Sequence, residues 1–225
     1  MELLRLWAYP NPHCVTRLGH MTNFARSERL TLAALLREVG PDAPTLCDGW
    51  STRDLAVHIV IRDRYPSAMA GEATETTAKI PFLSKRSEQR RRELSELDWK
   101  QLVGMVAEGP GVLSPVGWGP GEILANTVEF YVHVEDVRRA RRGWTRRNIL
   151  PELEQQLWSA LPTMVRLPPW RPETAVKFIA PGIGEFSFGK TDVKSKVVSG
   201  KPSEIVLYAL GRQEQAQVEV RSEKI

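Results

Sequence analysis

The sequence predicts a mainly α protein: an antiparallel four-helix bundle over about residues 21–143, followed by a small α+β domain over residues 144–225. Two observations support this fold class. Before Gly143, four segments carry apolar residues at the three- and four-residue spacing of a helix with one buried face. After Gly143, short β-like runs are separated by Pro-Gly and Gly-Lys turns, which is typical of short strands.

The first two predicted helices have clear start and stop signals. Residues 23–39 place apolar side chains at helical spacing, with Thr22 or Asn23 as the N-cap and Gly40-Pro41 as the stop. The second helix begins at Ser51-Thr-Arg-Asp54, a capping box in which two side chains satisfy backbone N–H groups at the helix start. Pro66 is expected to end or kink this helix.

The later elements follow from similar signals. A third helical region runs from about residue 85 to 107, with a break near Asp98, and a Gly- and Pro-rich loop leads to a fourth helix over about residues 122–142. Pro151 opens a further amphipathic helix. The remaining segments are expected to form three strands, a short helix and a last strand, at about residues 173–180, 184–188, 194–200, 202–210 and 216–221.

Two of the predicted helices carry side chains that could close one metal site. Glu129 and His133 are four residues apart in the fourth helix, so they lie on one face, and Asp136 continues the stripe by one turn. His58 lies in the second helix, which faces the fourth if the two are neighbours in the bundle. Two imidazoles and one carboxylate leave a coordination position open, the pattern of catalytic zinc that also suits ferrous iron.

Simpler interpretations of these residues stay open. A single histidine in a helix is more often a core or capping residue than a ligand, and a Glu-x-x-x-His pair also forms a plain contact on a helix surface. The neighbours favour a metal, because His58 lies in the apolar run 55–61 and Glu129 and His133 lie in the apolar run 128–134. A buried carboxylate is costly unless it is paired or bound to a cation.

Composition excludes several classes of protein. The chain is 42% hydrophobic and 26% charged, with a net charge of +4, which is ordinary for a globular protein. No apolar run approaches the roughly 20 residues of a membrane span, so no membrane association is expected. The basic runs 85–92 and 138–147 lack interleaved aromatic residues or a reading motif, which argues against nucleic-acid binding. The second run could hold an anionic ligand, although solvated surface is the simpler interpretation.

The cysteines and the N-terminal stretch suggest a cytoplasmic protein. Cys14 and Cys47 form no CxxC motif and fit a reducing compartment. No histidine lies near Cys47 in the sequence, which favours a buried or idle thiol over a reactive one. Residues 1–20 lack the apolar stretch of a signal peptide, so we expect a poorly ordered extension ahead of a natural start at Met21.

Three segments together resemble a known family. They are SERLTLAALLREVGPDAPTLCDGWSTRDLAVHIVIRDR, NTVEFYVHVEDVRRA and SEIVLYALGR. They resemble the actinobacterial maleylpyruvate isomerase-like proteins of the DinB-like superfamily of metal-binding four-helix bundles. The resemblance runs from about Met21 to the end of the chain.

The resemblance implies a role for each matching residue. His58, Glu129 and His133 match the metal ligands, most often of zinc, and Asp136 matches an acid beside the metal or at the substrate. Arg212 matches a terminal arginine that faces the cleft between domains. Characterised relatives use zinc to hold mycothiol, a small thiol, as the nucleophilic thiolate. Arg212 and the arginines that begin at Arg138 are then candidates to anchor this cofactor.

Three functions remain open at this point. The first is a zinc-dependent thiol transferase or isomerase that acts on a small electrophile, with Arg212 gripping a carboxylate in a two-pronged fashion. A surface or interdomain ion pair is an equally open role for Arg212. The second is a hydrolase that uses Asp136 as general base. The third is a non-enzymatic module that binds a metal or ligand. A monomer or a homodimer is expected in each case.

Overall fold

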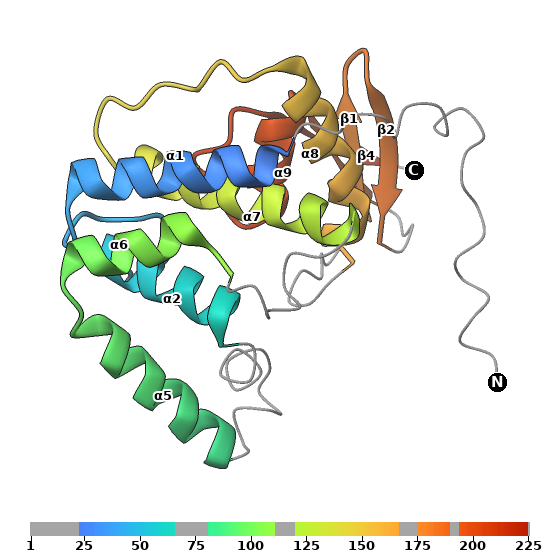
Figure 1. The fold of residues 1–225 in the computed structure, drawn as a ribbon. Helices are drawn as coiled ribbons and strands as arrows, with labels where there is room; N and C mark the ends of the chain where they lie inside the picture. Colours follow the sequence, from blue (N-terminus) through green and yellow to red (C-terminus); the bar gives the residue numbers. More distant parts are fainter. Residues whose placement is uncertain (1–22, 66–80, 111–119, 167–174, 190–193, 225) are drawn as a thin grey trace.

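The computed structural model describes residues 23–65, 81–110, 120–166, 175–189 and 194–224, and every structural statement below concerns these residues. They form a mainly helical protein with a small sheet towards the C-terminus (Figure 1). This confirms the predicted fold class. The predicted extension, residues 1–20, lies outside the described ranges, and the predicted domain boundary near residues 143–150 stays a prediction.

Five helices make up the N-terminal part. They are α1 (Phe24–Val39), α2 (Thr52–Arg64), α5 (Pro81–Ser95), α6 (Trp99–Glu108) and α7 (Pro120–Arg139). Helix α1 packs against both α7 and α6, and α2 packs against α6 and α5 (Figure 1). None of the described helices is long and apolar enough to cross a bilayer.

The helix ends follow from local sequence. Asn23 caps α1, with its side-chain oxygen accepting from the Arg26 N–H at 3.1 Å. Ser51 and Asp54 form the expected capping box at the start of α2. Asp98 caps α6 and thereby divides the third predicted helical region into α5 and α6. Helix α1 stops at Gly40, whose φ of 81° lies in the left-handed region that favours glycine.

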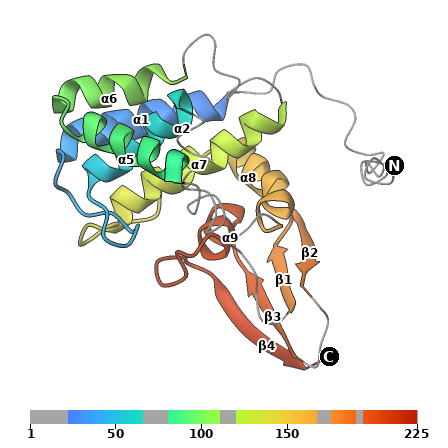
Figure 2. The ribbon, with the colours of Figure 1, turned by 90° about the horizontal axis from the view of Figure 1, so that it is seen from below.

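The C-terminal part combines helices with one sheet. Its elements are α8 (Pro151–Met164), β1 (Ala175–Ala180), β2 (Gly184–Phe188), β3 (Lys194–Ser199), α9 (Pro202–Ala209) and β4 (Glu219–Lys224). The strand order is β2-β1-β3-β4, with β1 and β3 parallel and the two outer pairs antiparallel (Figure 2). Helix α8 packs against α9 and against α7. The sheet thus lies to one side of the helices.

Helix α7 contributes to two separate hydrophobic cores. Its side chains Phe130, Val134 and Val137 pack in the core of α1, α2 and α6. Its side chains Val128 and Tyr131, together with Val132, pack in the core of α8, α9 and the sheet. A helix that is apolar on most of its circumference is expected to be buried on most sides. Glu129, His133 and Asp136 lie between these two apolar faces.

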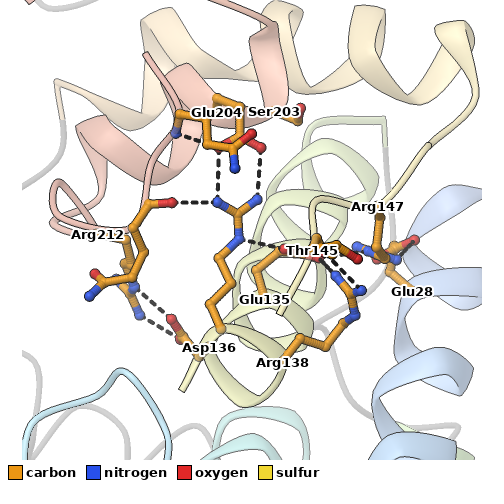
Figure 3. A network of polar contacts seen from close by, with 12 residues as sticks. Glu28, Glu135, Asp136, Arg138, Thr145, Arg147, Ser203, Glu204 and Arg212 are labelled. Carbon is orange, nitrogen blue, oxygen red and sulfur yellow. Dashed lines mark hydrogen bonds and ion pairs between the residues drawn. The ribbon is translucent and has the colours of Figure 1, made fainter. Parts of the chain in front are cut away.

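A buried ion network joins the two parts of the chain (Figure 3). Arg139 of α7, whose side chain has no exposed surface, donates to Glu135 of α7 and to both carboxylate oxygens of Glu204 of α9. Arg147 bridges Glu135 to Glu28 of α1, with both ion pairs at 2.7 Å. Three helices from distant parts of the sequence therefore meet in one charged cluster.

Candidate metal centre

His58, Glu129 and His133 converge at the interface of α2 and α7. The Glu129 Oε1 atom lies 3.3 Å from His58 Nε2 and 3.3 Å from His133 Nε2. The ligand atoms of all three residues lie within 4.8 Å of one another. Glu129 and His133 of α7 thus lie next to His58 of α2, as predicted from the sequence.

The spacing of these atoms fits a small divalent cation. Nitrogen and oxygen ligands lie about 2.0–2.2 Å from zinc, so two ligands of a tetrahedral site are about 3.3–3.6 Å apart. Both contacts of Glu129 Oε1 match this separation. Burial alone would raise the pKa of Glu129, but hydrogen bonds to His133 and His58 outweigh it and hold the pKa well below the ordinary glutamate value. The carboxylate is therefore ready to act as an anionic ligand.

A guanidinium already neutralises part of this charge. Arg62 of α2 places its Nε atom 3.4 Å from Glu129 Oε1 and donates from Nη2 to Asn126 Oδ1 at 2.5 Å. A bound cation would therefore share the Glu129 carboxylate with Arg62. Trp50 covers the other side of His58, with 5.2 Å between the ring centroids.

Asp136 holds His133 from behind. Its Oδ2 atom lies 2.9 Å from His133 Nδ1, so the Nε2 atom of the ring faces Glu129. Burial alone would lower the pKa of His133, but hydrogen bonds to Asp136, Cys47 and Glu129 raise it well above the ordinary histidine value. The Asp136 side chain is fully buried, as expected for a group that orients a ligand.

Arg212 completes the support of this histidine from the C-terminal part. Gly211, with a φ of 92°, turns the chain after α9. Arg212 then donates from Nε to Asp136 Oδ1 at 2.8 Å and from Nη2 to Asp136 Oδ2 at 2.6 Å (Figure 3). The two-pronged grip of this guanidinium is made to Asp136 across the two parts of the chain, and a contact with a ligand carboxylate stays a prediction.

Sequence reasoning missed Cys47. The sequence favoured an idle thiol, but Cys47 Sγ lies 3.3 Å from Asp136 Oδ2 and 3.6 Å from Arg212 Nη2, and it lines the site. Cys47, His133 and Asp136 form a second group of potential metal ligands. Cys47 and Asp136 are 89 positions apart, so no local spacing could have indicated this contact.

Arg138 does not join the site. It donates to Glu135 Oε1 at 3.0 Å and to the Thr145 carbonyl oxygen at 3.2 Å (Figure 3). Residues that are two apart in a helix point about 200° apart around its axis, so the side chain of Arg138 points away from that of Asp136. Its placement therefore gives no support to the predicted cofactor contact.

An open cavity of about 800 Å³ gives access to these groups. It lies between α2, α7, the loop before α2 and the segment after α9. The described residues that line it are Leu46, Cys47, Asp48, Trp50, His58, Arg62, Glu129, His133, Leu210, Gly211 and Arg212. A small molecule that enters this cavity can therefore reach the candidate ligands.

Comparisons with known proteins agree with this fold. Residues 25–114 match the family described as mycothiol maleylpyruvate isomerase N-terminal domain; His58 lies inside this match, whereas Glu129 and His133 lie beyond it. No curated protein matches the chain. The crystal structure of the mycothiol-dependent maleylpyruvate isomerase is similar at 18% identity and a TM-score of 0.53, covering 89% of this chain and 90% of that chain. A histidine-to-alanine mutant of that enzyme gives 18% identity, a TM-score of 0.52 and the same coverage. These likenesses show a shared fold.

Proposed function

We propose that this chain, whose residues 25–114 match the mycothiol maleylpyruvate isomerase N-terminal domain, is a metal-dependent enzyme of that superfamily that activates a small thiol. His58, Glu129 and His133 hold the metal, which is zinc. The thiol is mycothiol or a close analogue. It attacks a small electrophilic substrate, in a transferase or isomerase reaction.

The observation that carries the proposal is the convergence of two imidazoles and one carboxylate at the wall of an open cavity. The three residues come from two helices, and the Glu129 Oε1 atom lies 3.3 Å from the Nε2 atom of each histidine. A donor set of this kind leaves a coordination position free for a ligand. When bound there, the metal supplies a positive charge that favours the thiolate form of an external thiol.

The surrounding residues prepare this position. Asp136 fixes the orientation of His133, and Arg212 fixes Asp136 through two charge-assisted hydrogen bonds. Arg62 and Arg212 line the same cavity together with the carboxylates of Asp48 and Glu129, so a cation bound to Glu129 would leave the cavity net positive and favour an anionic thiol and an anionic substrate. Trp50 provides an apolar wall beside His58.

Two alternatives receive less support from the geometry. A hydrolase would need a free general base, but both Asp136 oxygens accept from Arg212 and one of them also contacts His133. A storage or sensing module does not need an open cavity of about 800 Å³ in front of the ligands. The thiol-dependent reaction needs Asp136 only to orient His133, and it needs the open cavity to admit the thiol and the substrate.

The test is a titration of cobalt-loaded protein with mycothiol, followed by its visible absorption spectrum. We expect one cobalt per chain and a strong spectral change as sulfur enters the metal shell. His58→Ala should lose most of the bound metal, whereas Arg138→Gln is the matched control and should behave as the native chain, because Arg138 lies outside the cavity. If the protein is fully loaded with cobalt and its absorption spectrum does not change on addition of mycothiol, the thiol-dependent reaction is excluded.

A further inference from the structure

We propose that Asp48 and Trp50, at the rim of the cavity, bind an uncharged, hydroxyl-bearing ring at the far end of the thiol. The proposal deepens the proposed function, and it rests on that function for a thiol at the metal. Mycothiol carries such an end, a glucosamine ring joined to inositol. The two residues thereby select which thiol the chain accepts.

A tight turn fixes both residues beside the candidate metal centre. The Trp50 N–H donates to the Cys47 carbonyl oxygen at 3.0 Å, and Gly49 has a φ of 72°, a left-handed conformation that favours glycine. The Leu46 N–H donates to the Asp136 carbonyl oxygen at 3.1 Å, which ties the same loop to α7. The turn therefore has a fixed place relative to the metal ligands of that helix.

Asp48 and Trp50 present unused hydrogen-bonding groups to the cavity. Asp48 is exposed and lines the cavity, and its carboxylate has no partner among the described residues. Trp50 also lines the cavity, and its indole N–H is accessible and has no acceptor in the described part of the chain. A carboxylate accepts hydrogen bonds from hydroxyl groups, and an indole N–H donates to them. One acceptor and one donor beside an aromatic face therefore match a ring that carries several hydroxyls.

The position of Trp50 suits a ligand that also reaches the metal. The centroid of the Trp50 ring lies 5.2 Å from that of the His58 imidazole, so a thiol on a metal held by His58 has this indole as a direct neighbour. The cavity volume is about 800 Å³. Cavities of about 300–1,000 Å³ hold drug-sized ligands, so this one has room for much more than a cysteine-sized thiol.

Charges at the rim favour an uncharged end over an ionic one. The Asp48 carboxylate opposes a second carboxylate at this place. A cationic end is also opposed, because the Arg91 guanidinium lies 6.0 Å from the centroid of the Trp50 ring and Arg62 and Arg212 line the cavity. A neutral end with hydroxyl groups avoids both penalties and still forms hydrogen bonds with Asp48 and Trp50.

A purely structural role is the competing interpretation of these two residues. Trp50 packs against the core of α1, α2 and α6, and an Asp-Gly pair is common in turns. A structural residue would alter the binding of every thiol through the metal. A residue that contacts the far end alters only the binding of a thiol that has this end, so the experiment compares two thiols that differ there.

The experiment titrates the full-length, cobalt-loaded protein with mycothiol and with N-acetylcysteine methylamide, which keeps the acylated cysteine of mycothiol and lacks its rings. The absorption spectrum gives a dissociation constant for each thiol, and we expect mycothiol to bind more tightly. Asp48→Ala and Trp50→Ala should each weaken mycothiol about 3- to 10-fold, the size of one hydrogen bond or one aromatic contact, and leave the truncated thiol within about twofold.

Matched variants separate contact with the ligand from effects on the fold. Asp42→Ala removes an exposed carboxylate of the same loop that does not line the cavity, and it should change the binding of neither thiol. Trp50→Phe keeps an aromatic ring and should retain most of the mycothiol affinity. Equal losses for both thiols in Asp48→Ala and Trp50→Ala, or binding in both chains that equals that of Asp42→Ala, would overturn the proposal.

Cysteamine, a thiol with an ammonium end, tests whether Asp48 selects a cation instead. It should bind the native chain and Asp48→Ala with similar affinity. A preference for the native chain as large as that of mycothiol would show a cation site and would also overturn the proposal.

A thiol-free ligand separates this proposal from the proposed function. N-Acetylglucosaminyl-inositol, the ring part of mycothiol, is added to the full-length protein, and saturation-transfer NMR should show binding that weakens in Asp48→Ala and Trp50→Ala. If it binds in this way while mycothiol leaves the cobalt spectrum unchanged, the thiol-dependent function is wrong and the ring site stands. If mycothiol changes the spectrum but neither substitution distinguishes the two thiols, the function stands and the ring site is wrong.

Discussion

Removing the Arg139 side chain should strongly destabilise the whole chain. Arg139 donates to Glu135 Oε2 at 2.6 Å, to the two oxygens of Glu204 at 2.7 and 2.9 Å, and to the Gln215 carbonyl at 2.6 Å. In Arg139→Ala, the fully buried Glu204 keeps the Gln217 N–H at 2.8 Å as its remaining contact in the described chain. Leaving one partner of a buried ion pair uncompensated costs about 3–5 kcal/mol.

The neighbouring Arg138→Ala is the matched control. Arg138 also pairs with Glu135, at 3.0 Å, but its side chain is 26% exposed. Such pairs contribute only about 0–1 kcal/mol. For a chain of this size each kcal/mol shifts the melting temperature by about 2–4 °C, so Arg139→Ala should melt about 6–20 °C lower and Arg138→Ala within about 4 °C of the native chain.

Urea unfolding followed by tryptophan fluorescence, with calorimetry for the melting temperature, measures both variants in metal-free protein. The pair of changes Arg139→Met and Glu204→Gln should recover part of the loss, because it removes both charges together. Equal midpoints for Arg139→Ala and Arg138→Ala would refute the reasoning, since they would show that the buried pair has no more effect than the exposed one.

Two further predictions concern the cap of α2 and the protonation of the site. Ser51→Ala removes the capping box and should cost about 0.5–2 kcal/mol in urea unfolding, whereas the mid-loop change Asp42→Asn should be nearly neutral; equal effects would contradict the capping role. His133 must lose a proton to bind a metal, and its pKa in the metal-free protein is raised, so cobalt affinity should keep rising with pH above about 6.5. Asp136→Asn replaces the carboxylate whose hydrogen bond raises this pKa with a neutral amide, and should move the rise to lower pH; superimposable profiles would exclude that coupling.

Local signals carried most of the fold prediction. Asn23, the Ser51–Asp54 box, Asp98 and Pro151 each act on the helix end beside them, so the sequence contains the whole cause of these ends. The break at Asp98 was visible for the same reason. The strands of the sheet were also indicated by their own composition and turns.

The candidate site was predictable only in part. The spacing of Glu129 and His133 is a property of one helix, and the apolar run around His58 indicated that it faces inward. The contacts of Cys47 and Arg212 with Asp136 join positions 89 and 76 residues apart, and only the packing of the two parts of the chain creates them. The sequence offers Arg138 and Arg212 equally as candidates to anchor a cofactor. Only the tertiary structure shows that Arg212 lines the cavity and that Arg138 contacts Glu135 and Thr145 instead.

The position of α7 in two cores makes the candidate metal centre a reporter of the entire fold. A fragment that ends after α7 would expose Val128, Tyr131 and Val132, which are at most 4% exposed in the full chain, and should self-associate. Loosening of either core disturbs the helix that carries Glu129 and His133. By linkage, a metal held by these residues should stabilise both halves together and make them unfold in one cooperative transition.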